Sequence, residues 1–197
     1  MKRNTYSKGF RLWHWLNAIA IFGLLGTVLL RKTFLSYKTN GQVIMDELAK
    51  LDMTITLDAA KAIARTIRAP MWEWHYILGF ALAILLVYRI VLHFKEKSLC
   101  FMDEFKAAPD MHEKGIYLMY GAFYGFVIVM SVTGLVLYFG KDAGMDRDTL
   151  HMIKEFHEVL MWFFVVFVPA HIIGLFVAEN RGDKGIVSDM IGEEKGV

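Results

Sequence analysis

Cysteine is almost absent from the 197-residue sequence, which contains Cys100 and no other residue of this type. A single cysteine excludes an intrachain disulfide and a metal or iron–sulfur cluster held by several cysteines. A strong charge imbalance is also missing, since 22 basic and 20 acidic residues leave a formal net charge of +2. This balance gives no argument for a nucleic-acid partner. The class of the protein must therefore be inferred from its apolar residues.

Apolar residues dominate the composition: 56% of the residues are hydrophobic, 14% are aromatic, and the mean hydropathy is +0.39. They form four runs long enough to cross a bilayer. The runs predict an all-α, polytopic membrane protein with spans at approximately 10–30, 72–94, 115–139 and 157–178. Because the spans and their connections use nearly the whole length, we expect one transmembrane domain over residues 1–197.

The first apolar run, Leu12–Leu30, has to be distinguished from a cleaved signal peptide. It is longer than the apolar region of a signal peptide and lacks a small-residue cleavage motif. It also ends in Arg31 and Lys32, which favours a membrane boundary. We therefore interpret it as a retained span.

Two histidines, His157 and His171, bracket thirteen mostly apolar residues of the fourth span. Fourteen helical steps return to within about 40° of the same face and advance about 21 Å along the axis. Ionisable side chains inside a span are costly and indicate function. The spacing suits ligands of two stacked haems, one in each leaflet. The alternative is that each histidine is an ordinary core residue.

Two further histidines lie at matching depths. With both termini on one side of the membrane, His14 lies near that side and His75 near the opposite side. On the fourth span, His157 is level with His75, and His171 is level with His14. The sequence therefore predicts two bis-histidine haem sites, His14 with His171 and His75 with His157. No Cys-x-x-Cys-His motif is present, so both haems would be bound non-covalently.

Three histidines remain outside these pairs: His93, His112 and His151. His93 is eighteen residues after His75, about 27 Å along a helix, which places it at or beyond the membrane interface. His112 and His151 lie in polar flanks. We interpret all three as ordinary surface residues; the alternative is proton exchange near a quinone or contact with haem propionates.

Three sequence stretches resemble a known family: RLWHWLNA in the first span, WEWHYILGF in the second, and HEVLMWFFVVFVPAH in the fourth. Together with the tail NRGDKGIVSDMIGE, they resemble the bacterial four-helix di-haem cytochrome b family. This family includes cytochrome b561 and the cytochrome b subunits of nickel hydrogenases and formate dehydrogenase. The resemblance covers nearly the whole chain and implies a four-helix bundle that holds two b-type haems between its helices. It implies the same four histidine ligands. The long first connection and the lack of a fused soluble module depart from the family pattern and leave the redox partner open.

The connection over residues 31–70 is long, and we expect two amphipathic helices in it, around Met45–Leu51 and over Asp58–Arg68. Thr56 or Asp58 is the expected N-cap of the second helix. These helices are either surface helices or a docking surface for a redox partner. The basic residues that would form this surface are Lys61, Arg65 and Arg68.

Several other side chains are candidates for supporting roles. Cations near the span ends either bind haem propionates or only mark topology: Arg11, Arg89 and Arg181 on the side of the termini, and Arg31, Lys32 and Arg68 on the other. Aromatic residues expected to line the gap between the haems are Trp15, Trp162, Phe163 and Phe164. Candidate proton carriers for a quinone are Glu73, Glu158, His93 and Glu179.

The function that these observations favour is transmembrane electron transfer through two b-type haems, between the membrane quinone pool and a redox partner. The partner would be another subunit of a larger oxidoreductase or a periplasmic electron carrier. One alternative is a stand-alone superoxide:quinone oxidoreductase, and another is a membrane scaffold or transporter without haem. Twelve of the 22 Lys and Arg residues lie on the side of the termini and ten on the other. This slight excess and the resemblance favour a bacterial inner-membrane protein with cytoplasmic termini.

Overall fold

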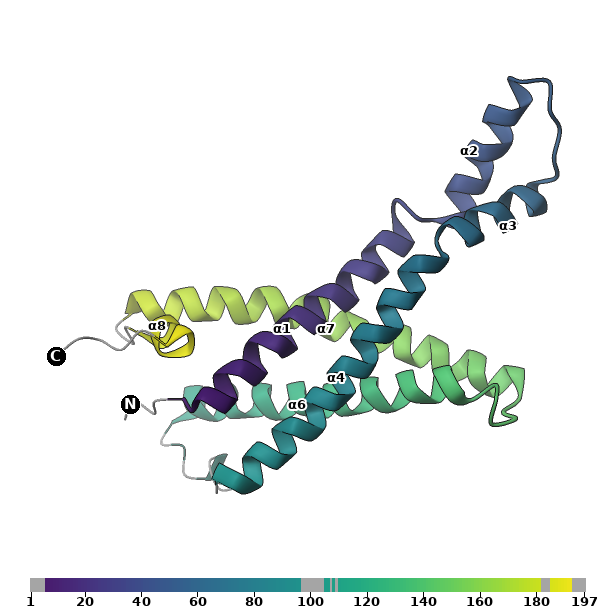
Figure 1. Ribbon diagram of the computed structural model, residues 1–197. Helices are drawn as coiled ribbons and strands as arrows, with labels where there is room; N and C mark the ends of the chain where they lie inside the picture. Colours follow the sequence, from purple (N-terminus) through teal and green to yellow (C-terminus); the bar gives the residue numbers. More distant parts are fainter. Residues whose placement is uncertain (1–5, 97–104, 107, 109, 182–184, 193–197) are drawn as a thin grey trace. The chain divides into compact units, whose positions relative to one another are not determined.

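The computed structural model describes residues 6–96, 105–106, 108, 110–181 and 185–192. Cys100 and the side chain of His112 lie outside this description. The described residues form helices and contain no strand, which confirms the all-α prediction. The helices in chain order are α1 (Lys8–Lys32), α2 (Tyr37–Ala49), α3 (Leu57–Ile67), α4 (Ala69–Glu96), α6 (Met111–Phe139), α7 (Arg147–Arg181) and α8 (Ile186–Ile191) (Figure 1).

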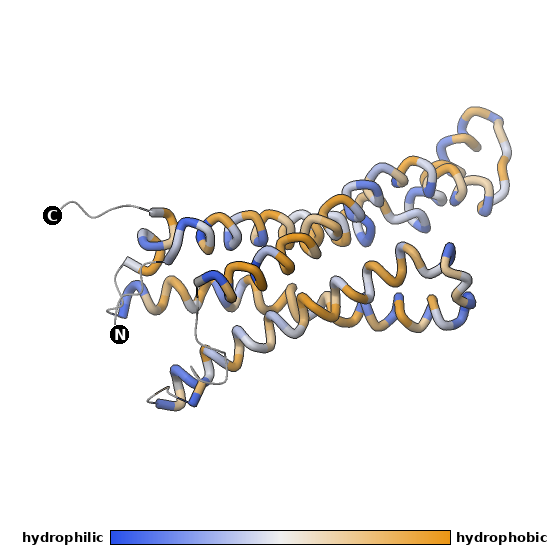
Figure 2. The backbone as a smooth tube through the Cα atoms, turned by 60° about the horizontal axis from the view of Figure 1, so that its bottom comes forward, coloured by the Kyte–Doolittle hydropathy of each residue, from blue (hydrophilic) through white to orange (hydrophobic). Residues whose placement is uncertain are grey.

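Four of these helices, α1, α4, α6 and α7, are long and apolar enough to cross a membrane. Figure 2 shows apolar residues along these helices and hydrophilic residues gathered near their ends and in the connections. The helices extend beyond the predicted apolar spans because their end turns are polar. The largest extension is in α7, which begins at Arg147, outside the apolar run. There Asp146 accepts a hydrogen bond from the Thr149 amide at 2.8 Å. The hydrogen bonds from Thr149 lower the pKa of the Asp146 carboxyl group.

The residues divide into two compact units, one of residues 1–19 with 80–197 and the other of residues 20–79. In the second unit, α2 and α3 pack against each other (Figure 1). A Cβ at Gly41 would lie 2.9 Å from Cγ of Lys61, so the glycine permits this close packing. Thr56 caps α3 by accepting the Ala59 amide at 3.2 Å. Helix α2 begins earlier than the expected Met45, because Ser36 caps it and it starts at Tyr37.

In the first unit, α6 and α7 pack side by side and are joined by residues 140–146. Aromatic rings form much of the contact: Phe126 stacks on Phe163 with centroids 3.9 Å apart, and Phe123 stacks on Phe167 at 4.8 Å. Short helix α8 follows α7 and is held by Glu179. Its carboxylate accepts the amides of Gly185 at 2.6 Å and of the next two residues at 3.1 and 3.4 Å. The first unit thus presents two long helices with a shared apolar seam.

Candidate functional site

The predicted ligands His14 and His171 lie next to each other in the first unit, one on α1 and the other on α7. Their ring centroids are 6.4 Å apart, and the rings are inclined by 50°. Metal–imidazole bonds are about 2 Å long and the ring centre lies about 1 Å beyond the nitrogen, so imidazoles on opposite sides of one iron have centroids about 6 Å apart. The observed separation therefore suits a bis-histidine haem.

Aromatic rings surround this histidine pair. Trp15 meets the His14 ring edge-on at 5.3 Å, and Phe167 stacks on His171 at 5.7 Å with an interplanar angle of 7°. The Nδ1 atom of His14 is buried and has no hydrogen-bond partner among the described residues. An unpaired buried nitrogen is costly, and a bound group at this place would offset that cost. The residues present therefore fit a haem.

His157 lies fourteen residues before His171 on α7 and faces α6. Its Nδ1 is 2.8 Å from the Thr133 hydroxyl. A Cβ added at the neighbouring Gly134 would lie 3.4 Å from Cε1 of His157, so this imidazole packs directly against the α6 backbone. The position of the His157 ring is therefore set from α6 by one hydroxyl and one glycine.

His75, on α4 in the second unit, has similar surroundings. Its Nδ1 is 2.8 Å from the hydroxyl of Thr27 on α1, and Trp72 meets its ring edge-on at 5.6 Å. A Cβ at Gly23 would lie 2.6 Å from Cδ1 of Leu78, so α1 and α4 approach closely one turn from this hydrogen bond. His75 and His157 belong to different units, and their pairing stays a prediction.

Sequence reasoning missed the two threonines and Phe167. Thr27 is 7% exposed, so it is a buried hydroxyl in an otherwise apolar run. Such a residue is a usable signal, because buried polar groups need a partner. Thr133 is likewise a hydroxyl in an apolar run, in α6, but it is only half-buried. Phe167 had no signal beyond its spacing of four residues from His171, which places both on one face.

Among the predicted cations, Arg89 has the most distinctive surroundings. Its Nε donates to the Tyr124 hydroxyl at 3.0 Å, and its guanidinium lies 5.1 Å from the centroid of Phe10 and 5.5 Å from that of Trp13. Its Nη1 is buried without a hydrogen-bond partner in the described part of the chain. Arg11 instead donates to the Tyr6 carbonyl at 3.1 Å, and Arg181 is exposed at the end of α7. Arg89 thus keeps a donor available for a propionate.

The aromatic residues expected between the haems have different positions. Phe163 and Phe164 belong to the α6–α7 seam, and Phe164 is 4% exposed. Trp15 contacts His14 directly. Trp162 was wrongly placed with them, because it is 57% exposed and lies on a different face of α7 from His157 and His171.

The candidate proton carriers are mostly engaged elsewhere. Glu179 caps α8, and Glu158 forms an ion pair with Lys154 at 3.3 Å. Glu73 is exposed. Of the other histidines, His93 meets the ring of Phe94 edge-on at 5.6 Å. His151 is exposed and lies 3.5 Å from Glu155.

The described residues contain no group of three or more His, Cys, Asp or Glu side chains that could hold a metal ion. A haem iron differs from such an ion, because the porphyrin supplies four of its ligands and the protein needs to supply only two. Paired histidines are therefore the arrangement through which these residues can bind iron.

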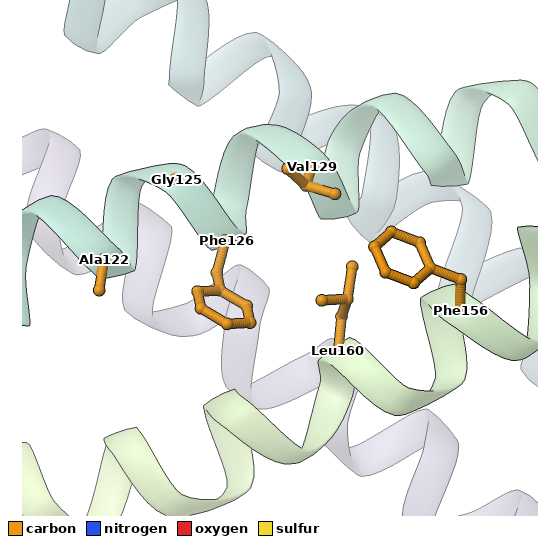
Figure 3. Close-up of a pocket in the computed structure, with 6 residues that line it drawn as sticks. All are labelled: Ala122, Gly125, Phe126, Val129, Phe156 and Leu160. Carbon is orange, nitrogen blue, oxygen red and sulfur yellow. The ribbon is translucent and has the colours of Figure 1, made fainter.

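An apolar pocket of about 290 Å³ lies between α6 and α7. Figure 3 shows that Phe126 and Leu160 project into the space between the two helices, with Phe156 at one end. The pocket is lined by Ala122, Gly125, Phe126, Val129, Phe156 and Leu160. No lining side chain can donate or accept a hydrogen bond, so the pocket suits hydrocarbon and not a polar head group.

Four membrane-spanning helices and a closely spaced histidine pair define the class of multi-pass membrane haem proteins. The family model described as prokaryotic cytochrome b561 matches residues 5–193, and the chain belongs to this family. Searches of curated proteins and of solved structures find no match. As a member of the family, the protein binds b-type haem and transfers electrons across a bacterial membrane.

Proposed function

We propose that the protein passes electrons through two b-type haems between the quinone pool of the bacterial inner membrane and a redox partner. His14 and His171 would hold one haem, and His75 and His157 the other. The observation that carries the proposal is the 6.4 Å separation of the His14 and His171 rings. A second histidine at a different depth on the same helix, His157, extends it to two haems.

The spacing of the two histidines on α7 supports separate sites. Fourteen residues correspond to about 21 Å of helix, within a hydrocarbon core about 30 Å thick. At this distance His157 and His171 cannot both bind the iron of one haem, so each would need its own haem and a second histidine from another helix. Two haems, stacked across the membrane, satisfy the four histidines with none left over.

Bound haem supplies one-electron redox chemistry. The protein would contribute the histidine ligands, the apolar surroundings and the charges that set the potentials. Phe164 and Phe167 lie on the α7 face between His157 and His171 and exclude water from the space between the two proposed haems. The Arg89 guanidinium lies over Trp13, the residue before His14, and offers a buried donor and a positive charge that would suit a propionate.

The quinone and partner assignments rest on the chemistry of the class. A quinone is hydrophobic and takes up protons with electrons, so its site belongs at a membrane edge beside an ionisable group. We propose that the chain serves as the cytochrome b subunit of a larger oxidoreductase, with cytoplasmic termini. Purification from the native membrane with mild detergent should retain such a partner.

The test of the central proposal is haem stoichiometry. The purified full chain should contain two b-type haems per polypeptide by pyridine haemochrome analysis, with a low-spin bis-histidine optical spectrum. The exposed His151→Ala variant is the matched control and should also retain two. A fully loaded wild-type sample with one haem, or none, would contradict the proposal.

A second candidate function, superoxide oxidation coupled to quinone reduction, is favoured by one cluster in the second unit. The guanidinium groups of Arg65 and Arg68 lie 4.7 and 4.8 Å from the ring centroid of Tyr37. Burial lowers the pKa of Arg68, and the nearby positive charge of Arg31 lowers it further. Concentrated positive charge attracts small anions.

This second candidate has a direct test. Purified protein with a soluble quinone analogue should consume enzymatically generated superoxide without an added partner. Replacing Arg65 and Arg68 by Gln should slow that reaction and reduce its salt dependence. No quinone reduction by superoxide at any ionic strength would reject the stand-alone function and leave the partner-linked one.

A further inference from the structure

We propose that Thr27 and Thr133 are positioning residues that fix the tautomer and ring orientation of His75 and His157, leaving Nε2 of each imidazole to bind iron. The inference rests on the proposed function, in which these two histidines hold one haem. It assigns a role to two hydroxyl groups that are not themselves proposed as iron ligands.

The proton of the Thr133 hydroxyl is directed to the backbone of its own helix, α6. Oγ1 of Thr133 donates to the Val129 carbonyl at 2.8 Å and is 3.2 Å from the Met130 carbonyl. A hydroxyl has one proton to donate and lone pairs to accept. With its proton directed to the helix backbone, Oγ1 is an acceptor toward Nδ1 of His157, 2.8 Å away. We infer that Nδ1 carries the proton.

The same arrangement occurs at Thr27, in the other unit. Its Oγ1 donates to the Leu24 carbonyl at 2.6 Å and is 2.8 Å from Nδ1 of His75. The hydroxyl again accepts from the imidazole. Thr27 on α1 and Thr133 on α6 thus each place a hydroxyl oxygen as acceptor at Nδ1 of a histidine, His75 and His157 respectively.

The consequence for iron follows from histidine chemistry. In a neutral imidazole one nitrogen carries the proton and the other carries the lone pair, and a hydrogen bond at one nitrogen determines which. A proton held on Nδ1 leaves the Nε2 lone pair for the metal. A hydrogen bond from Nδ1–H also fixes the ring plane and makes the ligand more basic, which stabilises the ferric state.

Thr33 provides an internal comparison. Its hydroxyl donates to the Leu29 carbonyl, four residues back, at 2.7 Å, as that of Thr133 does to Val129, but Thr33 is exposed just after the end of α1. A threonine bonded to its own helix therefore does not by itself require a histidine partner. The additional feature at Thr27 and Thr133 is the imidazole placed on the remaining lone pair.

The experiment compares Thr27→Val and Thr133→Val with Thr27→Ser and Thr133→Ser in the full chain, with Thr33→Val as the matched control. Three properties are measured: haem content, the midpoint potential of each haem by redox titration, and the ferric low-spin EPR signal, which depends on the angle between the imidazole planes. Each Val variant should raise the potential of one haem, alter its EPR signal and weaken its retention about tenfold. The Ser variants and Thr33→Val should match the wild type.

The outcomes separate this inference from the proposed function. Unchanged potentials and EPR signals in both Val variants, with two haems bound, would overturn the role of the threonines and leave the two-haem function intact. Equal changes in the Val and Ser variants would overturn it as well, because the hydroxyl would not be the cause. Shifts in two different haems would support the threonines and contradict the pairing of His75 with His157. A wild-type chain without two haems would already have contradicted the proposed function.

Discussion

The surroundings of the His14–His171 pair and those of His75 and His157 differ in the kind of group that orients the imidazoles. The first pair contacts aromatic rings, Trp15 at His14 and Phe167 at His171. The other two histidines each bond through Nδ1 to a threonine hydroxyl, and His75 also meets the ring of Trp72 edge-on. Packing restrains a ring by shape, whereas a hydrogen bond also selects its tautomer and changes its basicity.

In the proposed two-haem arrangement, this difference would give two chemically similar haems different potentials. At His14, the Nδ1 atom is buried without a partner in the described residues, so this imidazole has no hydroxyl to increase its basicity. At His75 and His157 the hydroxyls would favour the ferric state of the proposed haem. The two sites should therefore respond to different substitutions.

The largest effect should come from removing an axial ligand. His14→Ala or His171→Ala should each eliminate or convert one haem, and His75→Ala or His157→Ala should each affect the other proposed haem, because fourteen residues separate His157 from His171 by about 21 Å along α7. Redox titration of the α-band absorbance should resolve the two components. The His14→Ala/His157→Ala double variant should leave no intact bis-histidine site. Loss of the same component from both of these single variants would break the comparison and require His93 or His112 as a ligand.

The charge of Arg89, whose guanidinium lies over Trp13 next to His14 in the sequence, should have the next largest effect. Arg89→Gln removes a buried cation, and a positive charge favours the reduced haem, so the potential of the His14–His171 haem should fall by more than that of the other. Arg89→Lys keeps the charge without the planar group and should recover most of the potential but less of the stability. Equal shifts of both haems would mean that Arg89 acts on the whole protein and not on one site.

Helix spacing offers a test on the His75 side. Gly23→Ala places a methyl group against Leu78, which should push α1 from α4, weaken the hydrogen bond of Thr27 to His75 and cost about 1 kcal/mol. Thermal loss of haem absorbance should report the change, and Leu78→Ala in the same chain should reduce it. Gly26 has nothing within 4 Å of an added Cβ, so Gly26→Ala is the matched control and should be neutral or slightly stabilising.

The smallest effect should follow removal of one stacked ring. Phe167→Leu keeps an apolar side chain but loses the stacking on His171, worth about 1 kcal/mol. The EPR signal of the His14–His171 haem should broaden while the other signal stays unchanged. The exposed Trp162→Leu variant serves as control and should alter neither. A change in the His75–His157 haem instead would remove the distinction between ring-oriented and hydroxyl-oriented ligands.

The four membrane-spanning helices were predictable because hydropathy depends on composition over a long window, which local detail does not disturb. The shared level of His14 and His171 was predictable from depth, since alternating spans place residues at fixed levels. The contact of their rings was not, because depth does not say which spans are neighbours. The start of α2 was not predictable from apolar spacing, because Ser36 begins the helix before its apolar residues appear. Its capping hydroxyl was the better signal.

The threonines were missed for a different reason. A single hydroxyl in an apolar run changes the mean hydropathy little. Its histidine partner lies on another helix, and the spacing of residues within one helix does not say which residues of two helices face each other. Trp162 was misplaced because aromatic residues in a span were taken together, without separating the faces of α7. Counting in steps of 100° from His157 places Phe164 and Phe167 near the ligands and Trp162 away from them.

His157 and His171 lie on one helix, α7, which continues through Pro169, so the helix itself sets the distance between the two proposed haem sites. Loops elsewhere can lengthen or shorten without altering that distance. A one-residue insertion between the histidines would turn His171 by about 100° and remove it from His14. The interval can therefore change only by about one helical turn, to eleven or eighteen residues, while both imidazoles keep the same face.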